Sequence, residues 1–415
     1  MQTHLADFIR DTHEGQEANA ILRKCVHCGF CNATCPTYQL LGDELDGPRG
    51  RIYLIKQVLE GSAPTARTQL HLDRCLTCRA CETTCPSGVE YGRLVDIGRE
   101  LVERRVSRSA AASAWRRALM TVIPRRALFQ PLLALGRMTR PFLPAGLRRK
   151  VPPAPARPRP WPVSAHPRRM LVLDGCVQPA LSPATNAAAA RLLDRLGISL
   201  VRAANAGCCG AVSFHLNKQA EALDTMRGLI DAWWPQIEQG LEAIVITASG
   251  CGVTVKEYAH LFRHDPVYAA KAQRVSELSK DISEVIAAES ARLKPLLARH
   301  VGFIARQRVA FHAPCSLQHG LKRKGTVESL LTELGFPLTG VPDAHLCCGS
   351  AGTYSILQPA LSQQLLRNKI AALSSGRPTA ILTGNIGCQA HLQSATELPV
   401  RHWIEALDDA LPPAD

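Results

Sequence analysis

The stretch from Cys25 to Pro36 reads CVHCGFCNATCP, and the stretch from Cys75 to Pro86 reads CLTCRACETTCP. Both follow one pattern, C-x2-C-x2-C-x3-C-P, and the second copy begins 50 residues after the first (75 − 25). Three cysteines at a step of three residues fit on one tight turn and direct three thiolates to a common centre. The fourth cysteine lies beyond that turn, and the proline after it stops the helix from running on. These two stretches decide the fold of the N-terminal part of the chain.

This pattern is the one that binds [4Fe–4S] clusters in bacterial ferredoxins, where the fourth cysteine of each run ligates the other cluster. We therefore expect two [4Fe–4S] clusters. The predicted ligands are Cys25, Cys28, Cys31 and Cys85 for the first cluster, and Cys35, Cys75, Cys78 and Cys81 for the second. Zinc is the main alternative, with an unmetallated remnant as another. A zinc site needs two C-x2-C pairs and leaves the third cysteine and the repeated Cys-Pro unexplained.

The segment between the two runs, residues 37–74, is longer than a small β-rich ferredoxin would have. Within it, residues 51–60 (RIYLIKQVLE) carry apolar side chains at helical spacing and end before a glycine. We therefore predict an α-helical ferredoxin-type domain over residues 1–105, opened by a helix within residues 1–24. Arg49 precedes the predicted helix and Arg51 begins it. Two interpretations stay open: they donate hydrogen bonds and balance cluster charge, or they are solvated residues of a helix start.

The composition fits an intracellular metalloprotein. The 415 residues allow two or three domains, and the sixteen cysteines would suggest disulfides only in an oxidising compartment. Residues 1–15 (MQTHLADFIRDTHEG) contain no apolar stretch typical of a signal peptide, so we expect a cytoplasmic chain. No run of 18 apolar residues predicts a membrane span. The net charge of +14 leaves a soluble basic protein, an acidic partner, anionic lipid and nucleic acid open.

Residues 106–168 form an arginine- and proline-rich region, which we interpret as a helical segment and a linker. Residues 115–143 mix Leu, Phe and Trp with arginine. They predict either an amphipathic helix on an anionic membrane surface or a helical strut that leads into a polyproline linker. No recognisable nucleic-acid-binding module accompanies the arginines, so no nucleic-acid partner is expected.

The remaining chain is a duplicated unit, predicted to span residues 169–300 and 301–415. Each copy has a single cysteine, then a Cys-Cys-Gly triplet, then another single cysteine. The first two landmarks recur at an offset of 139 residues and the last at 137 (315 − 176, 347 − 208, 388 − 251). The candidate cofactor-binding cysteines are Cys176, Cys208, Cys209 and Cys251 in the first copy and Cys315, Cys347, Cys348 and Cys388 in the second.

A short apolar run precedes each single cysteine, over residues 170–173, 243–247, 309–311 and 380–383. Such runs predict buried parallel strands, and the carboxyl ends of parallel strands are where α/β sheets bind ligands. We therefore predict α/β units with a metal or redox site; buried small hydrophobic cysteines are the alternative. His312 and His345 are expected to be polar neighbours or surface residues and not ligands. Residues 249–252 (SGCG) lack the third glycine of a dinucleotide loop.

Two ferredoxin-type cysteine runs followed by two Cys-Cys-Gly units resemble the iron–sulfur subunits of glycolate oxidases (glycolate dehydrogenases) over nearly the whole chain. Subunits of anaerobic glycerol-3-phosphate dehydrogenase, lactate-utilisation proteins and heterodisulfide reductases share part of the pattern. The resemblance implies a multidomain α and α/β fold: an α-helical ferredoxin domain, then a duplicated α/β cysteine-rich (CCG) domain. It also implies an electron-transfer subunit with no catalytic residue of its own.

In this family FAD is bound by a partner subunit only, which oxidises glycolate to glyoxylate. The resemblance therefore implies FAD-containing glycolate oxidase subunits as partners and electron flow towards quinone. It also implies a complex that is either soluble in the cytoplasm or peripheral on the cytoplasmic face of the inner membrane. An equivalent subunit of a lactate or glycerol-3-phosphate dehydrogenase is the alternative within this role.

A heterodisulfide-reductase-like enzyme is the other alternative. In those proteins each unit ends in C-x-x-C, whereas the present units end in Cys251-Gly-Val-Thr254 and Cys388-Gln-Ala-His391. The missing last cysteine argues against disulfide reduction. A further iron–sulfur cluster in the C-terminal half, or a site that faces quinone, remains compatible with the other cysteines.

Overall fold

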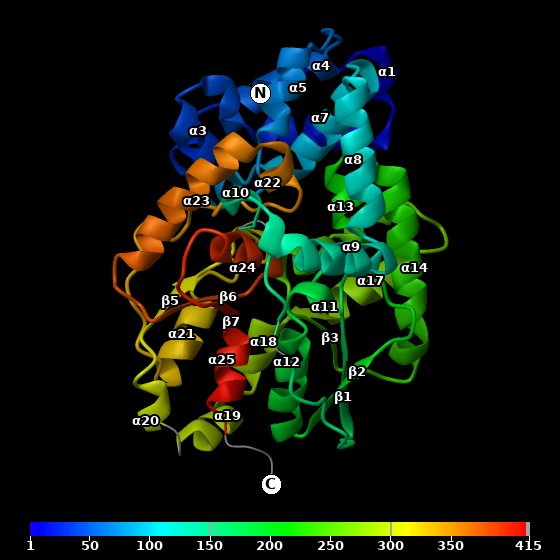
Figure 1. Ribbon diagram of the computed structural model, residues 1–415. Helices are drawn as coiled ribbons and strands as arrows, with labels where there is room; N and C mark the ends of the chain where they lie inside the picture. The colour runs from blue at the N-terminus through cyan, green and yellow to red at the C-terminus, as the bar shows by residue number, and fades with distance from the viewer. Residues whose placement is uncertain (149–150, 156, 299–300, 412–415) are drawn as a thin grey trace.

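The computed structural model describes residues 1–148, 151–155, 157–298 and 301–411. Its helical N-terminal domain lies at the end opposite the C-terminus, and two α/β units fill the rest of the molecule (Figure 1). The predicted fold class, a helical iron–sulfur domain followed by a duplicated α/β unit, is confirmed.

The N-terminal domain consists of short helices joined by the two cysteine loops. They are α1 (Asp7–Arg10), α2 (His13–Lys24), η1 (Phe30–Thr34), α3 (Pro36–Leu41), η2 (Glu44–Asp46), α4 (Pro48–Leu59), α5 (Ala66–Asp73), α6 (Ala80–Thr84) and α7 (Tyr91–Arg105). The single opening helix expected within residues 1–24 is two helices, because Thr12 caps a new one by accepting a bond from the Gly15 N–H at 3.0 Å.

The predicted helix at residues 51–60 begins earlier, at Pro48, which occupies the first helical turn where its missing N–H costs nothing. Pro36 behaves in the same way and opens α3. The prediction that the proline after the fourth cysteine stops a helix was therefore incomplete, because Pro36 also begins one. Helices α4 and α7 pack closely, since a Cβ added to Gly98 would lie 2.5 Å from Cγ1 of the fully buried Ile55.

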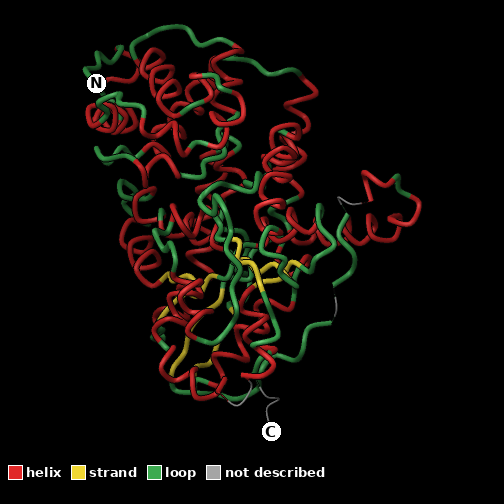
Figure 2. The backbone as a smooth tube through the Cα atoms, turned by 90° about the vertical axis from the view of Figure 1, so that its left-hand side faces the viewer, coloured by secondary structure: helices red, strands yellow, loops and turns green. Residues whose placement is uncertain are grey.

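Helices α8 (Ala110–Val122) and α9 (Arg126–Thr139), η3 (Arg140–Phe142) and α10 (Ala145–Arg148) follow. The part that leads to residues 149–150 projects from the body of the molecule (Figure 2). The linker then runs along the first sheet, where Trp161 Nε1 donates to the Leu200 carbonyl at 3.2 Å. Residues 149–150 and 156 of the predicted segment lie outside the described residues. None of the described helices has the length and apolarity needed to cross a membrane.

The first α/β unit contains four parallel strands in the order β2-β1-β3-β4. The strands are β1 (Arg168–Val172), β2 (Ile198–Arg202), β3 (Ala243–Ile246) and β4 (Ser279–Asp281). The helices are α11 (Gln178–Leu181), α12 (Ala184–Arg195), α13 (Ala211–His215), α14 (Gln219–Glu238), α15 (Ser249–Lys256), α16 (Tyr258–Leu261), α17 (Ala269–Leu278), α18 (Ile282–Ala288) and α19 (Ser290–Leu297). As predicted, the apolar runs before Cys176 and Cys251 form buried parallel strands.

The second unit contains three parallel strands in the order β5-β6-β7. They are β5 (Val309–His312), β6 (Ala380–Thr383) and β7 (Val400–His402). The other elements are α20 (Val301–Ile304), η5 (Ser316–Gly320), α21 (Thr326–Glu333), α22 (Tyr354–Leu357), α23 (Pro359–Ser374), α24 (Ile386–Gln393) and α25 (Trp403–Asp409). The predicted boundary between the units falls at residues 299–300, which lie outside the described residues, as do residues 412–415 of the second unit.

The two units share one hydrophobic core, to which both β1 and β5 contribute. Polar contacts join strand ends of the two sheets. His402 Nε2 donates to the Thr247 carbonyl at 2.8 Å, and the Ser249 N–H donates to the Gly384 carbonyl at 3.2 Å. Because Thr247 and Ser249 follow β3 and Gly384 follows β6, these contacts bring together the sheet edges that carry the cysteines.

Candidate iron–sulfur centres and cysteine sites

The two ferredoxin-type loops have the same backbone conformation. His27 (φ 59°) and Gly29 (φ 87°) in the first loop match Thr77 (φ 52°) and Arg79 (φ 59°) in the second. A left-handed conformation costs a non-glycine residue about 1–3 kcal/mol, so it persists only where the surroundings require it. Left-handed residues in a tight loop turn peptide N–H groups toward an enclosed anion, as in iron–sulfur sites. The backbone of both loops therefore fits a cluster.

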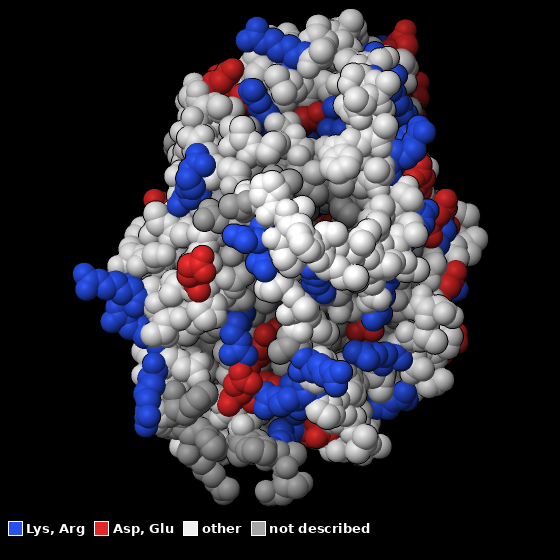
Figure 3. All heavy atoms as spheres, in the orientation of Figure 1, with Lys and Arg blue, Asp and Glu red and all other residues white. Residues whose placement is uncertain are grey.

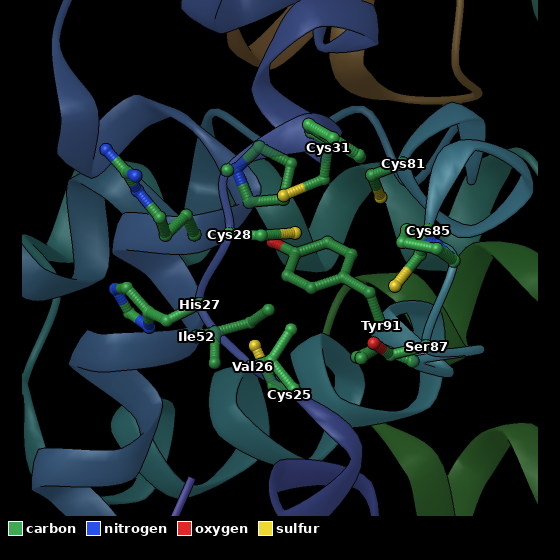
Figure 4. A pocket seen from close by; sticks show the side chains of 16 residues that line it. Cys25, Val26, His27, Cys28, Cys31, Ile52, Cys81, Cys85, Ser87 and Tyr91 are labelled. Atoms are coloured by element: carbon green, nitrogen blue, oxygen red, sulfur yellow. The ribbon is translucent and has the colours of Figure 1, made fainter.

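The cysteines fall into two groups that cross between the loops. Cys25, Cys28, Cys31 and Cys85 surround one cavity, and Cys81 also lines it (Figure 4). Burial and the neighbouring thiols of Cys25, Cys85 and Cys28 raise the pKa of Cys31 to about 11. The structure thus brings the fourth cysteine of the second run to the first three of the other run.

The second group forms around Cys81. Burial, followed by the neighbouring thiols of Cys78, Cys75 and Cys35, raises the pKa of Cys81 well above its usual range. Thiols gathered in this way lose their protons when they bind a metal, because the cation offsets their charge. The donor sets fit two [4Fe–4S] clusters, and the assignment of each cysteine to its cluster stays a prediction.

Polar groups lie beside the sulfurs of the second set. The Thr77 N–H donates toward Cys75 Sγ at 3.4 Å. The Thr37 hydroxyl lies 3.3 Å from Cys35 Sγ and donates to the Asp46 carbonyl at 2.8 Å. Hydrogen bonds to sulfur stabilise the more negative, reduced state of an iron–sulfur centre and raise its reduction potential. The contact from Thr77 therefore suits an electron acceptor.

Arg51 and Arg49 have different environments. Arg51 is 1% exposed, and it donates to the His71 carbonyl at 2.7 Å and to the Thr37 hydroxyl at 3.1 Å. Burial lowers its pKa, but the Cys75 thiol and other acidic neighbours outweigh that effect and hold the pKa above its usual value. Arg49 remains near the surface and pairs with Glu44 at 2.6 Å. Of these two arginines, only Arg51 is a buried charge beside the second set.

A second buried arginine was missed by the sequence analysis. Arg99, in α7, is 7% exposed and donates to the Cys75 carbonyl at 2.6 Å and to the Thr77 hydroxyl at 3.2 Å. It contacts the second loop from a position 14 or more residues downstream of that run's cysteines (99 − 85). No local pattern marks it, because its partners are distant in sequence.

The two cysteine groups differ in their surroundings. Cys28 is exposed at the surface, beside the exposed side chains of Val26 and Phe30. Cys78 instead packs into an apolar cluster with Cys315 and Cys347 of the second α/β unit. The first group therefore faces solvent, whereas the second group faces the C-terminal cysteines.

The Cys-Cys-Gly triplets of the two α/β units have matching geometry. The Gly210 N–H lies 3.4 Å from Cys208 Sγ, and the Gly349 N–H lies 3.4 Å from Cys347 Sγ. Both glycines are left-handed, with φ 82° and 88°, and a Cβ at Gly349 would lie 2.7 Å from the Ser362 carbonyl oxygen. Only glycine fits this turn, which points a backbone donor at the first sulfur of each pair.

The eight C-terminal cysteines form two groups of four, one group in each unit. In the first, hydrogen bonding to Cys208 and Cys251, together with burial, raises the pKa of Cys209 well above its usual range. In the second, Cys315 Sγ lies 3.8 Å from Cys347 Sγ. Both donor sets fit a centre that accepts thiolates, and all sixteen cysteines of the chain are free. Ligation by these eight also stays a prediction.

In the second unit a histidine and a lysine lie close to the cysteines. A ring nitrogen of His312 and the sulfurs of Cys348 and Cys388 all lie within 4.8 Å of one another. His312 is 2% exposed, so it is not a surface residue. Burial, with a smaller contribution from Lys369, lowers the pKa of His312 to about 3, so its ring is neutral at physiological pH. His345, the other histidine that was predicted to be a polar neighbour or a surface residue, lies outside this group.

Comparisons with known proteins agree with this arrangement. The family described as "4Fe-4S dicluster domain" matches residues 21–89, and the family described as "Cysteine-rich domain" matches residues 170–256 and 309–393. The eight cysteines within the first match imply two [4Fe–4S] clusters, and those of the other two matches suggest further metal sites.

Two of three curated relatives match the chain over most of its length, and the third matches about half of it. The "Glycolate oxidase iron-sulfur subunit" of Escherichia coli (strain K12) is 57% identical over 411 residues, which cover 99% of each chain. The "Probable glycolate oxidase iron-sulfur subunit" of Bacillus subtilis (strain 168) is 28% identical over 404 residues, 91% of this chain and 89% of that one. "Lactate utilization protein A" of Bacillus licheniformis is 25% identical over 227 residues, 53% of this chain and 91% of that one. The chain belongs to the family of glycolate oxidase iron–sulfur subunits.

Proposed function

We propose that this chain is the electron-transfer subunit of a glycolate-oxidising complex. It would accept electrons from a partner FAD subunit that converts glycolate to glyoxylate and would pass them towards quinone. The similarity to the Escherichia coli subunit over 99% of both chains carries the glycolate assignment. The two groups of four thiols support one-electron transfer, which [4Fe–4S] clusters supply when bound. In this proposal catalysis on the substrate takes place on the partner, and no residue of this chain is catalytic.

Electrons would enter at the first cysteine group. Cys28 is exposed, and its neighbours Val26 and Phe30 are 69% and 62% exposed. Exposed apolar side chains beside a redox centre form a suitable docking face, because a partner that covers them removes water and shortens the electron path. The partner flavoprotein is the proposed occupant of this face.

Electrons would leave the ferredoxin domain through the second group. Leu76 and Cys78 pack against Cys347 and Tyr354, with Cys315 alongside. The Tyr354 hydroxyl donates to the Arg74 carbonyl at 3.2 Å, which ties the second unit to the start of the second loop. This contact supports a path from the ferredoxin domain into the second α/β unit.

The surface of α9 supports a position on a membrane. Along this helix Leu128, Leu132, Leu135 and Met138 are 40–74% exposed, and none of its side chains is buried. Figure 3 shows the helix as an uncharged ridge with Lys and Arg side chains close by. Arg137 donates to the backbone carbonyl of Ala180 at 3.1 Å. This carbonyl is uncharged, so the contact does not neutralise the positive charge of Arg137. An amphipathic helix with such charges fits the surface of an anionic bilayer.

Anaerobic affinity purification from the native host tests the function. The eluate is analysed for flavin and for dye reduction with glycolate, D-lactate, L-lactate and glycerol 3-phosphate. We expect a co-purified flavoprotein and reduction that depends on glycolate. Activity with only another substrate would move the chain to a related dehydrogenase, and the absence of flavin and activity would contradict the proposal.

Flotation with vesicles tests the position on the membrane. The protein should bind vesicles that contain phosphatidylglycerol, bind poorly to neutral phosphatidylcholine vesicles, and be released by salt. Leu132→Glu with Leu135→Glu should abolish binding without lowering the solubility of the protein. Equal binding of this variant and the wild type would contradict the role of α9.

A further inference from the structure

The two α/β units differ at two matched positions beside their cysteines. Leu173 in the first unit corresponds to His312 in the second, at the offset of 139 residues that also relates Cys176 to Cys315. At the offset of 137 that relates the last cysteines, Thr254 corresponds to His391. The second unit therefore has two imidazoles where the first has an aliphatic side chain and a hydroxyl.

His391 stands where related reductases have the last cysteine, but its ring nitrogen is already engaged. Its Nε2 lies 3.2 Å from the Ser362 hydroxyl, and Ser362 in turn donates to the Gly349 carbonyl at 2.8 Å. His391 thus supports the Cys-Cys-Gly turn. It is a positioning residue in this arrangement.

The ring of His312, unlike that of His391, has a nitrogen that no described residue hydrogen-bonds. His312 ends β5 and is 2% exposed, and its Nε2 has no hydrogen-bond partner among the described residues. A ring nitrogen of His312 lies with the sulfurs of Cys348 and Cys388 in a set whose members are all within 4.8 Å of one another. An unpaired buried nitrogen costs free energy unless it binds something, and a neutral imidazole beside thiolates is a donor for transition metals.

The charges around this set suit thiolates. Lys369 is 3% exposed, and its Nζ donates to the Asp343 carbonyl at 2.8 Å. Burial lowers the pKa of Lys369, and the nearby thiols of Cys348 and Cys347 oppose that shift. The Asn385 side chain donates to Cys388 Sγ at 3.5 Å. A buried cation and an amide donor both stabilise negative sulfur, so the set fits a bound metal better than protonated thiols.

We propose that His312 Nε2, Cys348 Sγ and Cys388 Sγ ligate one metal atom, so that the second unit holds a mixed nitrogen and sulfur centre. The matched position in the first unit, Leu173, can supply no such donor. The ligand class is a transition metal that accepts thiolate and imidazole, either iron or zinc. The proposal is independent of which substrate the partner flavoprotein oxidises.

An imidazole in place of a thiolate makes the centre less negative by one charge. Where the metal is iron, this substitution raises the reduction potential, as histidine ligands do in other iron–sulfur centres. The second unit would then hold the more oxidising of the two C-terminal centres. It is also the unit whose cysteines Cys315 and Cys347 meet Cys78 of the ferredoxin domain.

Metal analysis of His312→Leu tests the assignment, because this variant gives the second unit the residue of the first. The full chain is purified anaerobically, and iron and zinc per chain are measured by mass spectrometry. His345→Leu is the matched control, since it removes a histidine of the same unit from outside the set. His312→Cys is the second variant, and circular dichroism confirms that each variant is folded.

Two spectroscopic readouts identify the nitrogen ligand for either metal. For iron, pulsed EPR of protein labelled with ¹⁵N-histidine should show a coupled nitrogen that His312→Leu loses and His345→Leu keeps. For zinc, absorption at the zinc edge should show one nitrogen among sulfur ligands. His312→Cys should retain the metal with sulfur ligands alone.

The proposal predicts that His312→Leu loses metal or the nitrogen signal and that the control loses neither. A wild-type chain with only the irons of the two ferredoxin clusters and no zinc would overturn it. Unchanged metal content together with unchanged nitrogen coupling in His312→Leu or His312→Cys would also overturn it.

Discussion

Arg79 in the second cysteine loop forms an ion pair with Glu257 of the first α/β unit, with Nη1 2.8 Å from Oε1. The side chains are only 14% and 23% exposed. The pair therefore fixes the ferredoxin domain on the first unit, while the adjacent Cys78 meets the second unit. One loop thus joins all three parts of the molecule.

A double-mutant cycle at this contact should detect coupling. Arg79→Ala and Glu257→Gln should each destabilise the holoprotein, and the double variant should lose less than the sum by about 1–2 kcal/mol, because the partly buried pair is lost only once. The midpoint of urea unfolding measures the effect for each variant. Strictly additive losses would show that the pair does not hold the domains together.

The buried and exposed arginines before α4 should respond differently to the same substitution. Arg51→Met should cost about 3–5 kcal/mol, because it leaves the buried partners of Arg51 without their cation. Arg49→Met should cost at most about 1 kcal/mol, since its pair with Glu44 is near the surface. Redox titration followed by EPR should also show a lower potential for the second cluster in Arg51→Met only.

Comparable losses for the two variants, or an unchanged potential in Arg51→Met, would contradict the view that Arg51 balances charge beside the second cysteine group. The change from arginine to methionine is identical at the two positions. A difference between them therefore reports on burial and on the distance to the cysteines.

Glycine is required in the second Cys-Cys-Gly turn. Gly349→Ala should destabilise the chain by about 1–3 kcal/mol, because φ is 88° and the new Cβ would meet the Ser362 carbonyl oxygen at 2.7 Å. Gly340→Ala is the matched control, as no atom lies within 4 Å of its Cβ position. Thermal unfolding of the holoprotein measures both, and equal melting temperatures would refute the steric argument.

Charge placed on the proposed docking face should weaken electron entry. Val26→Glu combined with Phe30→Glu should lower glycolate-dependent dye reduction at least about tenfold, the loss typical of a strong interface contact. Iron content should stay at the wild-type level. Val267→Glu is the control, because Val267 is 67% exposed and belongs to the first α/β unit and not to the ferredoxin-type domain.

If the control lowers activity as much as the double variant does, the loss cannot be assigned to the face around Cys28. If neither variant affects activity or partner binding, the flavoprotein docks elsewhere. Pull-down of the partner separates weaker binding from slower electron transfer within an intact complex.

The features that could be predicted from sequence are those encoded locally. The steps of three residues in the cysteine runs place three thiols on one turn, and the apolar run before Cys315 predicts the buried strand β5. The duplicated α/β organisation follows from the same local patterns. The exchange of Cys35 and Cys85 between the two groups was predicted from the known ferredoxin pattern. The structure places Cys85 beside Cys31 and Cys35 beside Cys81, and the ligation of each cluster stays a prediction.

Other features depend on contacts between distant segments. His312 lies at the end of β5, and Cys388 follows the neighbouring parallel strand β6. The Cys-Cys-Gly turn brings Cys348 to the same place, so the three residues meet although they are distant in sequence. Arg99 reaches the second loop from α7, and Lys369 reaches the cysteines from α23. The comparison of Leu173 with His312 could have revealed the nitrogen donor, because the repeat offset aligns them.

The central claim is that this chain accepts electrons from a glycolate-oxidising flavoprotein through its ferredoxin-type cysteine groups. Freeze-quench EPR of the anaerobically purified complex after addition of glycolate tests it most directly. The account predicts reduced iron–sulfur signals within the time of one turnover, and their loss in Cys28→Ser. Signals that appear with dithionite but not with glycolate, in a complex whose flavin glycolate does reduce, would contradict it.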